Sequence, residues 1–544
     1  MKPRVFLVVL VLVAHVFITS AVSLSVSSDA PSLVRLTEQG PVRGKYASRE
    51  VLGFFGIPFA APPLDELRFA LPMPPVAWGA SHVLDATSFR LPCAQRPRSL
   101  LNSSEDCLYL NVYTPLPTTP TPTPTIATGA AQKTPLLPTM VWIHGGAYTV
   151  GEPQTYNASS MAALGRVVVV TIAYRLGVFG FAAFDSPTTA ANVGLFDQQA
   201  ALRWVQRNIA SFGGDPQRVT VFGESAGGGS AIFHLLQRDS WPLIHRAVAE
   251  SPGVLWIPSL ERTRNATREF ASMLGCEDLA CMRSLSQDRL LSLPVLPCGA
   301  TMAFMPTLDG PGGWFEDQPF RMLESGRWHQ VPLVLGWNAQ EQNLFGAINL
   351  LHKPPLTPEQ YRAALNSTFG GAEQDPYALA PIVERIYAEE AAQLGLWQAY
   401  SRAVADFYLL AHCPSVIEPA LRQSSSPVFM YFFNYLPLAW VFQSMGCTHT
   451  AEIPFVFADP NVEGMVFDRK DRAFADSVSQ MWSSFAANGS SPTALWPDYR
   501  EEGHCYTLGA EATTPGAFPY NSTACNRLAD VMASAAQYPR ASVW

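Results

Sequence analysis

Uninterrupted apolar runs that alternate with helical patterns constrain this sequence most strongly. The runs VVVVTIAY (167–174) and RVTVF (218–222) lack polar alternation, which is typical of strands covered on both faces. Between them, apolar residues recur at helical spacing in ALRWVQRNIASF (201–212), which stops at two glycines. The order strand, helix, strand predicts an α/β fold with a central, mostly parallel sheet flanked by helices.

The chain has 544 residues, enough for two or three average domains, but α/β enzymes with long insertions reach this length around one core. A Pro/Thr tract at 114–138 interrupts the apolar rhythm, which resumes on both sides. Such a tract neither pairs in a sheet nor forms a helix. We therefore expect a surface loop within a single domain at 30–540; an interdomain linker is the alternative.

The first 23 residues, MKPRVFLVVLVLVAHVFITSAVS, have two cations, an apolar run and then small residues. This order predicts a secretory signal peptide at 1–22 and a secreted, extracellular protein; a retained anchor is the alternative. The net charge of -8, with no basic block, argues against nucleic acid as the main partner. No later apolar run is long enough to predict stable insertion into a membrane. N-glycans are expected at the N-x-[ST] sequons, which are Asn102, Asn157, Asn265, Asn366, Asn488 and Asn521.

Secretion changes how the nine cysteines are interpreted, because disulfides persist outside the cell. Two pairs are close enough in sequence to close short loops, and a third pair is possible between distant positions. These pairs are Cys93 with Cys107, Cys276 with Cys281, and Cys413 with Cys525. The state of Cys298, Cys447 and Cys505 stays open, with at least one odd thiol. No cysteine spacing is typical of a zinc site.

The motif GESAG (223–227) directly follows the run RVTVF and precedes a helical segment. Its two glycines allow a sharp turn, and the helix N-terminus would place N–H groups beside a developing oxyanion. The motif alone recurs by chance, and the alternative is a glycine-rich turn. Its place between strand and helix predicts that Ser225 is a nucleophile.

A nucleophilic serine also needs an electrophilic pocket. The segment HGGA (144–147) follows the strand VWI, and its small residues allow successive N–H groups to face a ligand. From their positions, the N–H groups of Gly146, Ala147 and Ala226 would form an oxyanion hole. A plain β-turn is the alternative.

The serine also needs a base and an orienting acid. His449 lies in a loop before an apolar segment far downstream, and Glu341 lies just past the predicted strand VPLVLGWN. An isolated histidine in such a loop is more often structural. The chain order serine, acid, histidine is nevertheless the order of α/β-hydrolases.

Several segments together resemble the type-B carboxylesterase/cholinesterase family over about residues 30–530. In order they are FFGIPFAAPPLDELRFALPMPP, EDCLYLNVY, VWIHGGAY, AYRLGVFGF, NVGLFDQQAALRWVQRNIASFGGDPQRVTVFGESAGG, GWNAQEQ and HTAEIPFVF. The resemblance implies an α/β-hydrolase fold and a serine carboxylesterase that forms an acyl-enzyme without cofactor or metal. It also implies a Ser225-Glu341-His449 triad and disulfides Cys93–Cys107 and Cys276–Cys281, with Cys413–Cys525 as a third.

Departures from the family pattern bear on the substrate. The family's oxyanion motif usually has three glycines and Phe, whereas this chain has Ala147 and Tyr148 at the last two positions. Ala147 adds a methyl where the acyl group approaches. The loop between Cys93 and Cys107 has no aromatic residue, although cholinesterases use a tryptophan there to stack on choline. It is also shorter than the lid of the family's lipases.

Two further positions give local expectations. Ser251-Pro252-Gly253 replaces the serine-glycine pair expected after RAVAE, so we expect weaker support for the triad acid. Glu224, beside the nucleophile, could bias the site toward positive or neutral alcohols, or could simply pack against the turn.

The expected function is therefore a secreted serine carboxylic-ester hydrolase for small to medium esters. Lipase-type or cholinesterase-type specificity is one alternative. A non-catalytic adhesion relative of the same fold is another, although all three triad positions are filled. The oligomeric state stays open.

Overall fold

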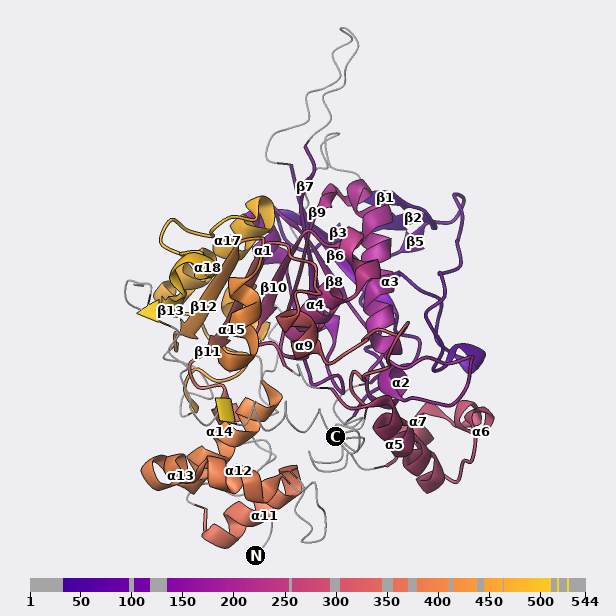
Figure 1. The fold of residues 1–544 in the computed structure, drawn as a ribbon. Helices are drawn as coiled ribbons and strands as arrows, with labels where there is room; N and C mark the ends of the chain where they lie inside the picture. The colour runs from indigo at the N-terminus through magenta and orange to yellow at the C-terminus, as the bar shows by residue number, and fades with distance from the viewer. Residues whose placement is uncertain are drawn as a thin grey trace, which may run out of the picture.

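The computed structural model describes residues 33–96, 102–117, 135–253, 257–293, 304–344, 356–369, 379–409, 414–437, 445–462, 464–509, 516–517 and 526–527. Within these residues, an 11-stranded sheet forms the centre (Figure 1). Its order is β14 (Gly516–Ala517), β13 (His504–Gly509), β12 (Val428–Asn434), β11 (Leu333–Asn338), β10 (Arg246–Glu250), β9 (Gly214–Glu224), β7 (Leu137–Ile143), β8 (Val168–Ile172), β6 (Tyr109–Pro115), β4 (Val51–Pro58) and β3 (Lys45–Tyr46). A small sheet contains β1 (Val34–Thr37), β2 (Gly40–Arg43) and β5 (Leu84–Asp85).

The sheet is mostly parallel, which confirms the predicted α/β fold. Every adjacent pair from β8 to β13 is parallel. The pairs β3–β4, β4–β6, β6–β8 and β13–β14 are antiparallel and lie toward the two edges. The carboxyl ends of β7, β9, β10 and β11 therefore meet at one edge of the sheet.

Both faces of the sheet are buried, which explains the uninterrupted apolar runs. In β7, Val141 and Ile143 belong to one core, whereas Met140 and Trp142 belong to the core on the opposite face. Helices α3 (Val193–Asn208) and α4 (Ala226–Leu236) contribute to the first core. Helices α1 (Ser159–Gly165) and α17 (Arg469–Asn488) contribute to the second.

The predicted helix at 201–212 is the second half of α3 followed by a tighter turn, η3 (Ile209–Phe212). It ends at Gly213, whose φ of 85° lies in the left-handed region that favours glycine at a helix end. The sequence pattern therefore located this element and its stop correctly.

The remaining described helices are mostly short. They are α2 (Gly177–Phe181), α5 (Leu260–Met273), α6 (Leu279–Ser284), α7 (Gln287–Leu290), α9 (Pro319–Glu324), α11 (Pro358–Phe369), α12 (Ala380–Ile386), α13 (Ala388–Leu394), α14 (Leu396–Tyr408), α15 (Pro414–Arg422), α16 (Ile453–Val456) and α18 (Tyr499–Glu502), with 3₁₀ turns η1 (Asp65–Leu67), η2 (Pro153–Thr155), η4 (Arg238–Leu243) and η7 (Pro460–Val462). Helices α11 to α14 gather at one end of the molecule, below the sheet in Figure 1. Within the described ranges, no helix is long and apolar enough to span a membrane.

The Pro/Thr tract lies between two strands of the same sheet, because β6 ends at Pro115 and β7 begins at Leu137. Most of the tract, 118–134, lies outside the described residues, as does the expected signal peptide at 1–22.

Two predicted disulfides are closed in the structure. Their Cα atoms are 4.9 Å apart in Cys93–Cys107 and 5.4 Å apart in Cys276–Cys281. Cys447 and Cys505 are buried free cysteines. Cys298, Cys413 and Cys525 lie outside the described residues, so the expected third disulfide stays a prediction.

Candidate active site

Ser225 occupies the turn between β9 and α4 in a strained backbone conformation. Its φ is 56° and its ψ is -119°, a combination that residues with side chains rarely adopt. The Ser225 N–H donates to the Glu250 carbonyl at 2.9 Å, and its carbonyl accepts from the N–H of Gly253 at 3.0 Å. These bonds hold the turn, and the serine side chain is partly exposed between two buried neighbours.

The two glycines of the motif are required by close packing on β7. A Cβ at Gly227 would lie 1.9 Å from the carbonyl oxygen of Ile143, and one at Gly223 would lie 2.5 Å from the same atom. Any larger residue would push α4 away from the sheet, so the glycines bring the helix N-terminus to the strand end.

The predicted oxyanion loop follows β7 and lies against this turn. Its residues 146–148 are all left-handed, with φ values of 106°, 54° and 58°. A Cβ at Gly145 would lie 3.2 Å from the Ser225 Cβ, so the loop and the serine are in close contact. Ala226 begins α4, where the first N–H groups have no partner inside the helix. The two elements that carry the predicted donors Gly146, Ala147 and Ala226 therefore meet at the serine.

The base of this loop is held by two aromatic residues. His144 stacks on Tyr174 with ring centroids 4.4 Å apart, and the Tyr174 hydroxyl donates to the His144 carbonyl at 2.9 Å. Complete burial lowers the pKa of His144 to about 4, so the imidazole is neutral. Its Nδ1 lies 2.9 Å from the carbonyl oxygen of Gly145, to which it donates. His144 is therefore a fixed structural residue.

His449 and Glu341 are in direct contact. The Nδ1 atom of His449 lies 2.6 Å from Oε2 of Glu341, and both side chains are buried. Because an ionised carboxylate only accepts, the Nδ1 atom carries the proton. The other ring nitrogen, Nε2, is therefore the one with the lone pair in the neutral imidazole.

Glu341 is well supported, so the expectation of weak support at Ser251 was wrong. The Ser251 hydroxyl donates to Oε1 of Glu341 at 2.5 Å, and the Asn338 N–H donates to the same oxygen at 2.8 Å. Ser251 follows β10, which lies beside β11 in parallel, so the hydroxyl reaches the acid from the adjacent strand end. This contact needs only the serine of the expected serine-glycine pair, so Pro252 in place of the glycine does not prevent it.

Glu224 also contacts the histidine. Its Oε1 atom lies 3.1 Å from Nε2 of His449, and the Glu224 side chain is buried. At this distance the lone pair on Nε2 and the carboxylate oxygen repel each other unless the histidine or the glutamate carries a proton there. Glu224 is therefore placed to stabilise a protonated His449.

Two more buried carboxyl groups, which the sequence did not single out, are linked to the site: Glu341 and His449 interact with Glu452, and Glu452 interacts with Glu250. Glu250 accepts from Trp482 Nε1 at 2.8 Å, and Glu452 accepts from the Asn338 side chain. Burial is the main reason that the pKa values of both carboxyl groups are raised. The charge of Glu452 raises the pKa of Glu250 further, and the charge of Glu341 raises that of Glu452. The sequence signal for these two residues was a glutamate within an apolar segment, in RAVAES for Glu250 and in HTAEIPFVF for Glu452. In the part of the chain that the structure describes, no group of potential ligands could hold a metal ion.

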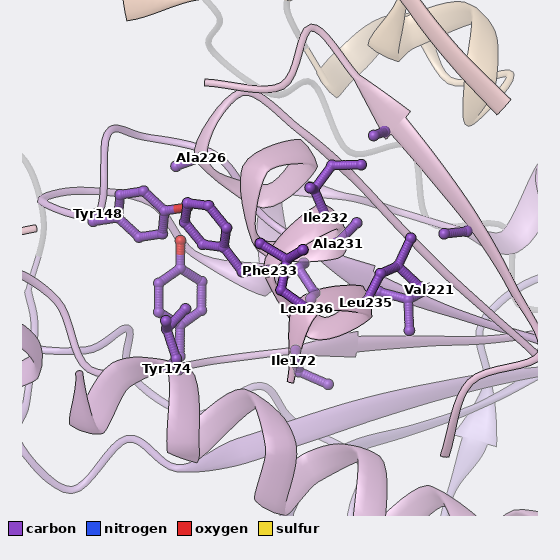
Figure 2. Close-up of a cluster of buried hydrophobic side chains, with 14 of the residues drawn as sticks. Tyr148, Ile172, Tyr174, Val221, Ala226, Ala231, Ile232, Phe233, Leu235 and Leu236 are labelled. Atoms are coloured by element: carbon purple, nitrogen blue, oxygen red, sulfur yellow. The ribbon is translucent and has the colours of Figure 1, made fainter. Parts of the chain in front are cut away.

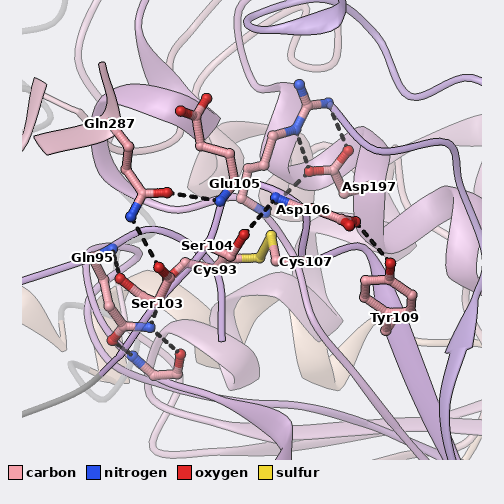
Figure 3. Close-up of a disulfide and its surroundings, with 12 residues drawn as sticks. Cys93, Gln95, Ser103, Ser104, Glu105, Asp106, Cys107, Tyr109, Asp197 and Gln287 are labelled. Carbon is pink, nitrogen blue, oxygen red and sulfur yellow. Dashed lines mark hydrogen bonds and ion pairs between the residues drawn. A yellow bond between two sulfur atoms is a disulfide. The ribbon is translucent and has the colours of Figure 1, made fainter. Parts of the chain in front are cut away.

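The loop closed by Cys93–Cys107 is fastened to the oxyanion loop (Figure 3). The Gln95 amide donates to the Gly151 carbonyl, and the Gly151 N–H donates back to Gln95, both at 2.8 Å. On its other side, Gln287 forms a reciprocal pair with the backbones of Ser103 and Glu105, both bonds at 2.9 Å. These bonds hold the described part of the loop against the oxyanion loop on one side and against α7 on the other.

Comparison with known proteins places the geometry in context. The model of the carboxylesterase family matches residues 31–526. Mouse cholinesterase is 32% identical over 527 residues, which cover 87% of this chain and 83% of that protein. Mouse acylcarnitine hydrolase is 32% identical over 511 residues, covering 86% of each chain. Pig liver carboxylesterase is 32% identical over 538 residues, covering 86% of this chain and 88% of its own.

Proposed function

The chain belongs to the carboxylesterase family and is a carboxylic-ester hydrolase, and we propose that Ser225, Glu341 and His449 are its catalytic triad. The observation that carries this proposal is the strained turn that presents Ser225 at the N-terminus of α4. It is joined by the contact between His449 and Glu341, whose Nδ1 and Oε2 atoms lie 2.6 Å apart. A serine presented in this way and a histidine with its proton fixed on Nδ1 are the two parts that nucleophilic acyl transfer requires.

In the proposed reaction, Nε2 of His449 takes the proton from the Ser225 hydroxyl as its oxygen attacks the ester carbonyl. The negative charge that develops on the carbonyl oxygen is stabilised by the N–H groups of Gly146, Ala147 and Ala226. Collapse of the tetrahedral intermediate breaks the bond to the alcohol oxygen, which takes the proton from His449. Water then attacks the acyl-enzyme in the same way and releases the acid.

Glu341 orients the imidazole and stabilises the imidazolium. Its own position is supported by Ser251 and the Asn338 N–H, which both donate to Oε1 and leave Oε2 for His449. Glu224 favours the same charged state from the opposite side of the ring. Since a negative charge on each side stabilises the positive ring, proton transfer from Ser225 becomes easier.

We propose small to medium esters as substrates. The methyl of Ala147 narrows the place where the acyl group approaches, and the loop from Cys93 to Cys107 contains no aromatic residue to stack on choline. Choline esters are the competing candidate, because mouse cholinesterase is among the relatives. The missing aromatic residue argues against them.

We also propose that the protein is secreted as one domain, with the signal peptide at 1–22 removed and N-glycans added. Support comes from the order of cations, apolar run and small residues at the N-terminus, and from the sequons. The two disulfides suit an oxidising compartment.

A series of p-nitrophenyl esters from acetate to dodecanoate, assayed beside acetylthiocholine, tests the substrate class. We expect the highest kcat/KM at short to medium acyl chains and a lower value for the choline ester. A maximum at the longest chain, or a preference for choline, would contradict the proposed class without affecting the triad.

A further inference from the structure

A chain of buried polar side chains leads from the oxyanion loop into the protein. Its consecutive distances are 3.4 Å from Tyr148 to Ser230, 3.1 Å from Ser230 to Gln198, 3.1 Å from Gln198 to His234 and 3.0 Å from His234 to Ser240. All five side chains are fully buried, at 0% exposure. A continuous network of buried hydrogen bonds fixes the positions of the side chains that it joins.

The hydrogens of this network have one consistent arrangement. Burial lowers the pKa of His234 to about 3, so its ring is neutral and has one N–H. The Gln198 carbonyl oxygen can only accept, so His234 Nε2 donates to it and Nδ1 accepts from Ser240. The Gln198 amide then donates to Ser230, which leaves the Ser230 hydrogen for the hydroxyl oxygen of Tyr148.

The last bond joins the two elements that carry the oxyanion donors. Tyr148 ends the left-handed run that contains Gly146 and Ala147, whereas Ser230 lies in α4, the helix that begins at Ala226. Figure 2 shows Tyr148 beside the helix that carries Ala226. A Cβ at Gly229 would lie 3.1 Å from the Tyr148 hydroxyl, so the hydroxyl also packs closely on the helix.

The loop needs such a fastening because its backbone is strained. Left-handed φ values of 54° at Ala147 and 58° at Tyr148 are unfavourable for residues with a Cβ. The Tyr148 ring packs edge-on against Phe181, with centroids 5.3 Å apart, and the Tyr148 carbonyl accepts from the Gly177 N–H at 2.7 Å. These contacts fix the ring and backbone, and the hydroxyl adds a side-chain hydrogen bond from the loop to α4.

We propose that Tyr148 is a positioning residue, whose hydroxyl fixes the oxyanion loop against α4 so that the donors of both elements face one point. The proposal rests on the proposed function, because it concerns the oxyanion hole of the same ester hydrolysis. The hydroxyl is a departure from the pattern that the resemblance implies, which usually has Phe at this position.

The test compares Tyr148→Phe, Ser230→Ala and the double variant with the parent, using p-nitrophenyl acetate and a trifluoromethyl ketone inhibitor that adds to the serine as a tetrahedral oxyanion. Tyr361→Phe is the matched control, because it removes the hydroxyl of another buried tyrosine, in α11. Tyr148→Phe is expected to lower kcat about five- to tenfold with little change in KM. The inhibitor constant should rise by the same factor as kcat/KM falls, and Tyr361→Phe should change neither.

The double variant should lose no more than the larger of the two single losses, because Ser230→Ala already removes the bond that Tyr148→Phe breaks, together with the bond from the Gln198 amide. The inference is overturned if Tyr148→Phe keeps the parent kcat/KM and inhibitor constant within about twofold, whatever its effect on thermal stability. In that case the parent's activity and its loss in Ser225→Ala still support the proposed function. A parent that hydrolyses no ester overturns both.

Discussion

Glu224 and His449 are in direct contact, with Oε1 of the carboxylate 3.1 Å from Nε2 of the ring. The sequence placed Glu224 beside the nucleophile and left open whether it biases the alcohol or packs locally. The contact points to a third role, because a carboxylate at Nε2 would act on the protonation of the histidine whatever the substrate carries.

Glu224→Gln is therefore expected to lower kcat/KM by about tenfold for neutral and cationic esters alike, because it removes a charge that stabilises the imidazolium. Phenyl acetate and acetylthiocholine, measured side by side, provide the comparison. A loss confined to acetylthiocholine would instead support a role in binding the alcohol.

Ser251→Ala should lower kcat by about 10- to 100-fold, because a hydrogen bond to a buried carboxylate is lost. The Asn338 N–H still donates to Glu341, so the acid stays in place and KM should change little. Ser477→Ala, which removes an exposed serine hydroxyl from α17, is the control and should match the parent. Steady-state kinetics that showed Ser251→Ala equal to this control would refute the supporting role.

Ala147→Gly should widen the acyl site and relieve a left-handed alanine with φ of 54°. We expect the ratio of kcat/KM for isobutyrate to that for acetate to rise by at least about threefold, with no loss of thermal stability. Ala473→Gly, at an exposed position of α17, is the matched control and should lower thermal stability and leave the ratio unchanged. An unchanged ratio in Ala147→Gly would mean that the methyl does not limit the acyl group.

Glu452 gives a prediction on pH. Burial and the charge of Glu341 raise its pKa to about 7, whereas a glutamate in the unfolded chain titrates near about 4.3. Between these two pKa values Glu452 is protonated in the folded protein and ionised in the unfolded chain. The stability that its proton contributes is therefore complete below the unfolded pKa and is lost as the pH rises through the folded pKa. The groups that face it include Glu250, Glu341 and His449.

In Glu452→Gln this titration is absent. From pH 5 to pH 8, the free energy of unfolding of the parent should fall relative to that of Glu452→Gln by roughly 1–3 kcal/mol. Urea unfolding at several pH values measures the difference, with Glu501→Gln on the surface as the control. Parallel profiles for the parent and Glu452→Gln would show that Glu452 does not titrate in this range.

The sheet could be predicted because its evidence is local. The run at 167–174 contains β8, whose alternate side chains enter cores on opposite faces, so apolar residues fill both sides of the strand. The end of α3 was equally local, because the left-handed turn at Gly213 favours glycine.

The site could be predicted only in part. Ser225 follows a recognisable strand, and its motif marks it. Glu341 and His449 lie 108 positions apart in sequence, so local patterns indicate each only as a candidate. The chain order and the family resemblance joined them. Ser251 lies 90 positions from the acid that it supports, and the bond depends on the adjacent parallel strands β10 and β11. A short motif carries no information on such a pairing, which explains the wrong expectation there.

The role of Ser225 is the central claim, and covalent labelling tests it most directly. The parent and Ser225→Ala are treated with one equivalent of a fluorophosphonate, which loses fluoride to a nucleophilic serine, and the adduct is located by peptide mass spectrometry. We predict a single adduct on Ser225 in the parent and none in Ser225→Ala, with ester hydrolysis reduced at least about 1000-fold in the variant. Equal labelling and equal hydrolysis in both proteins would contradict the assignment.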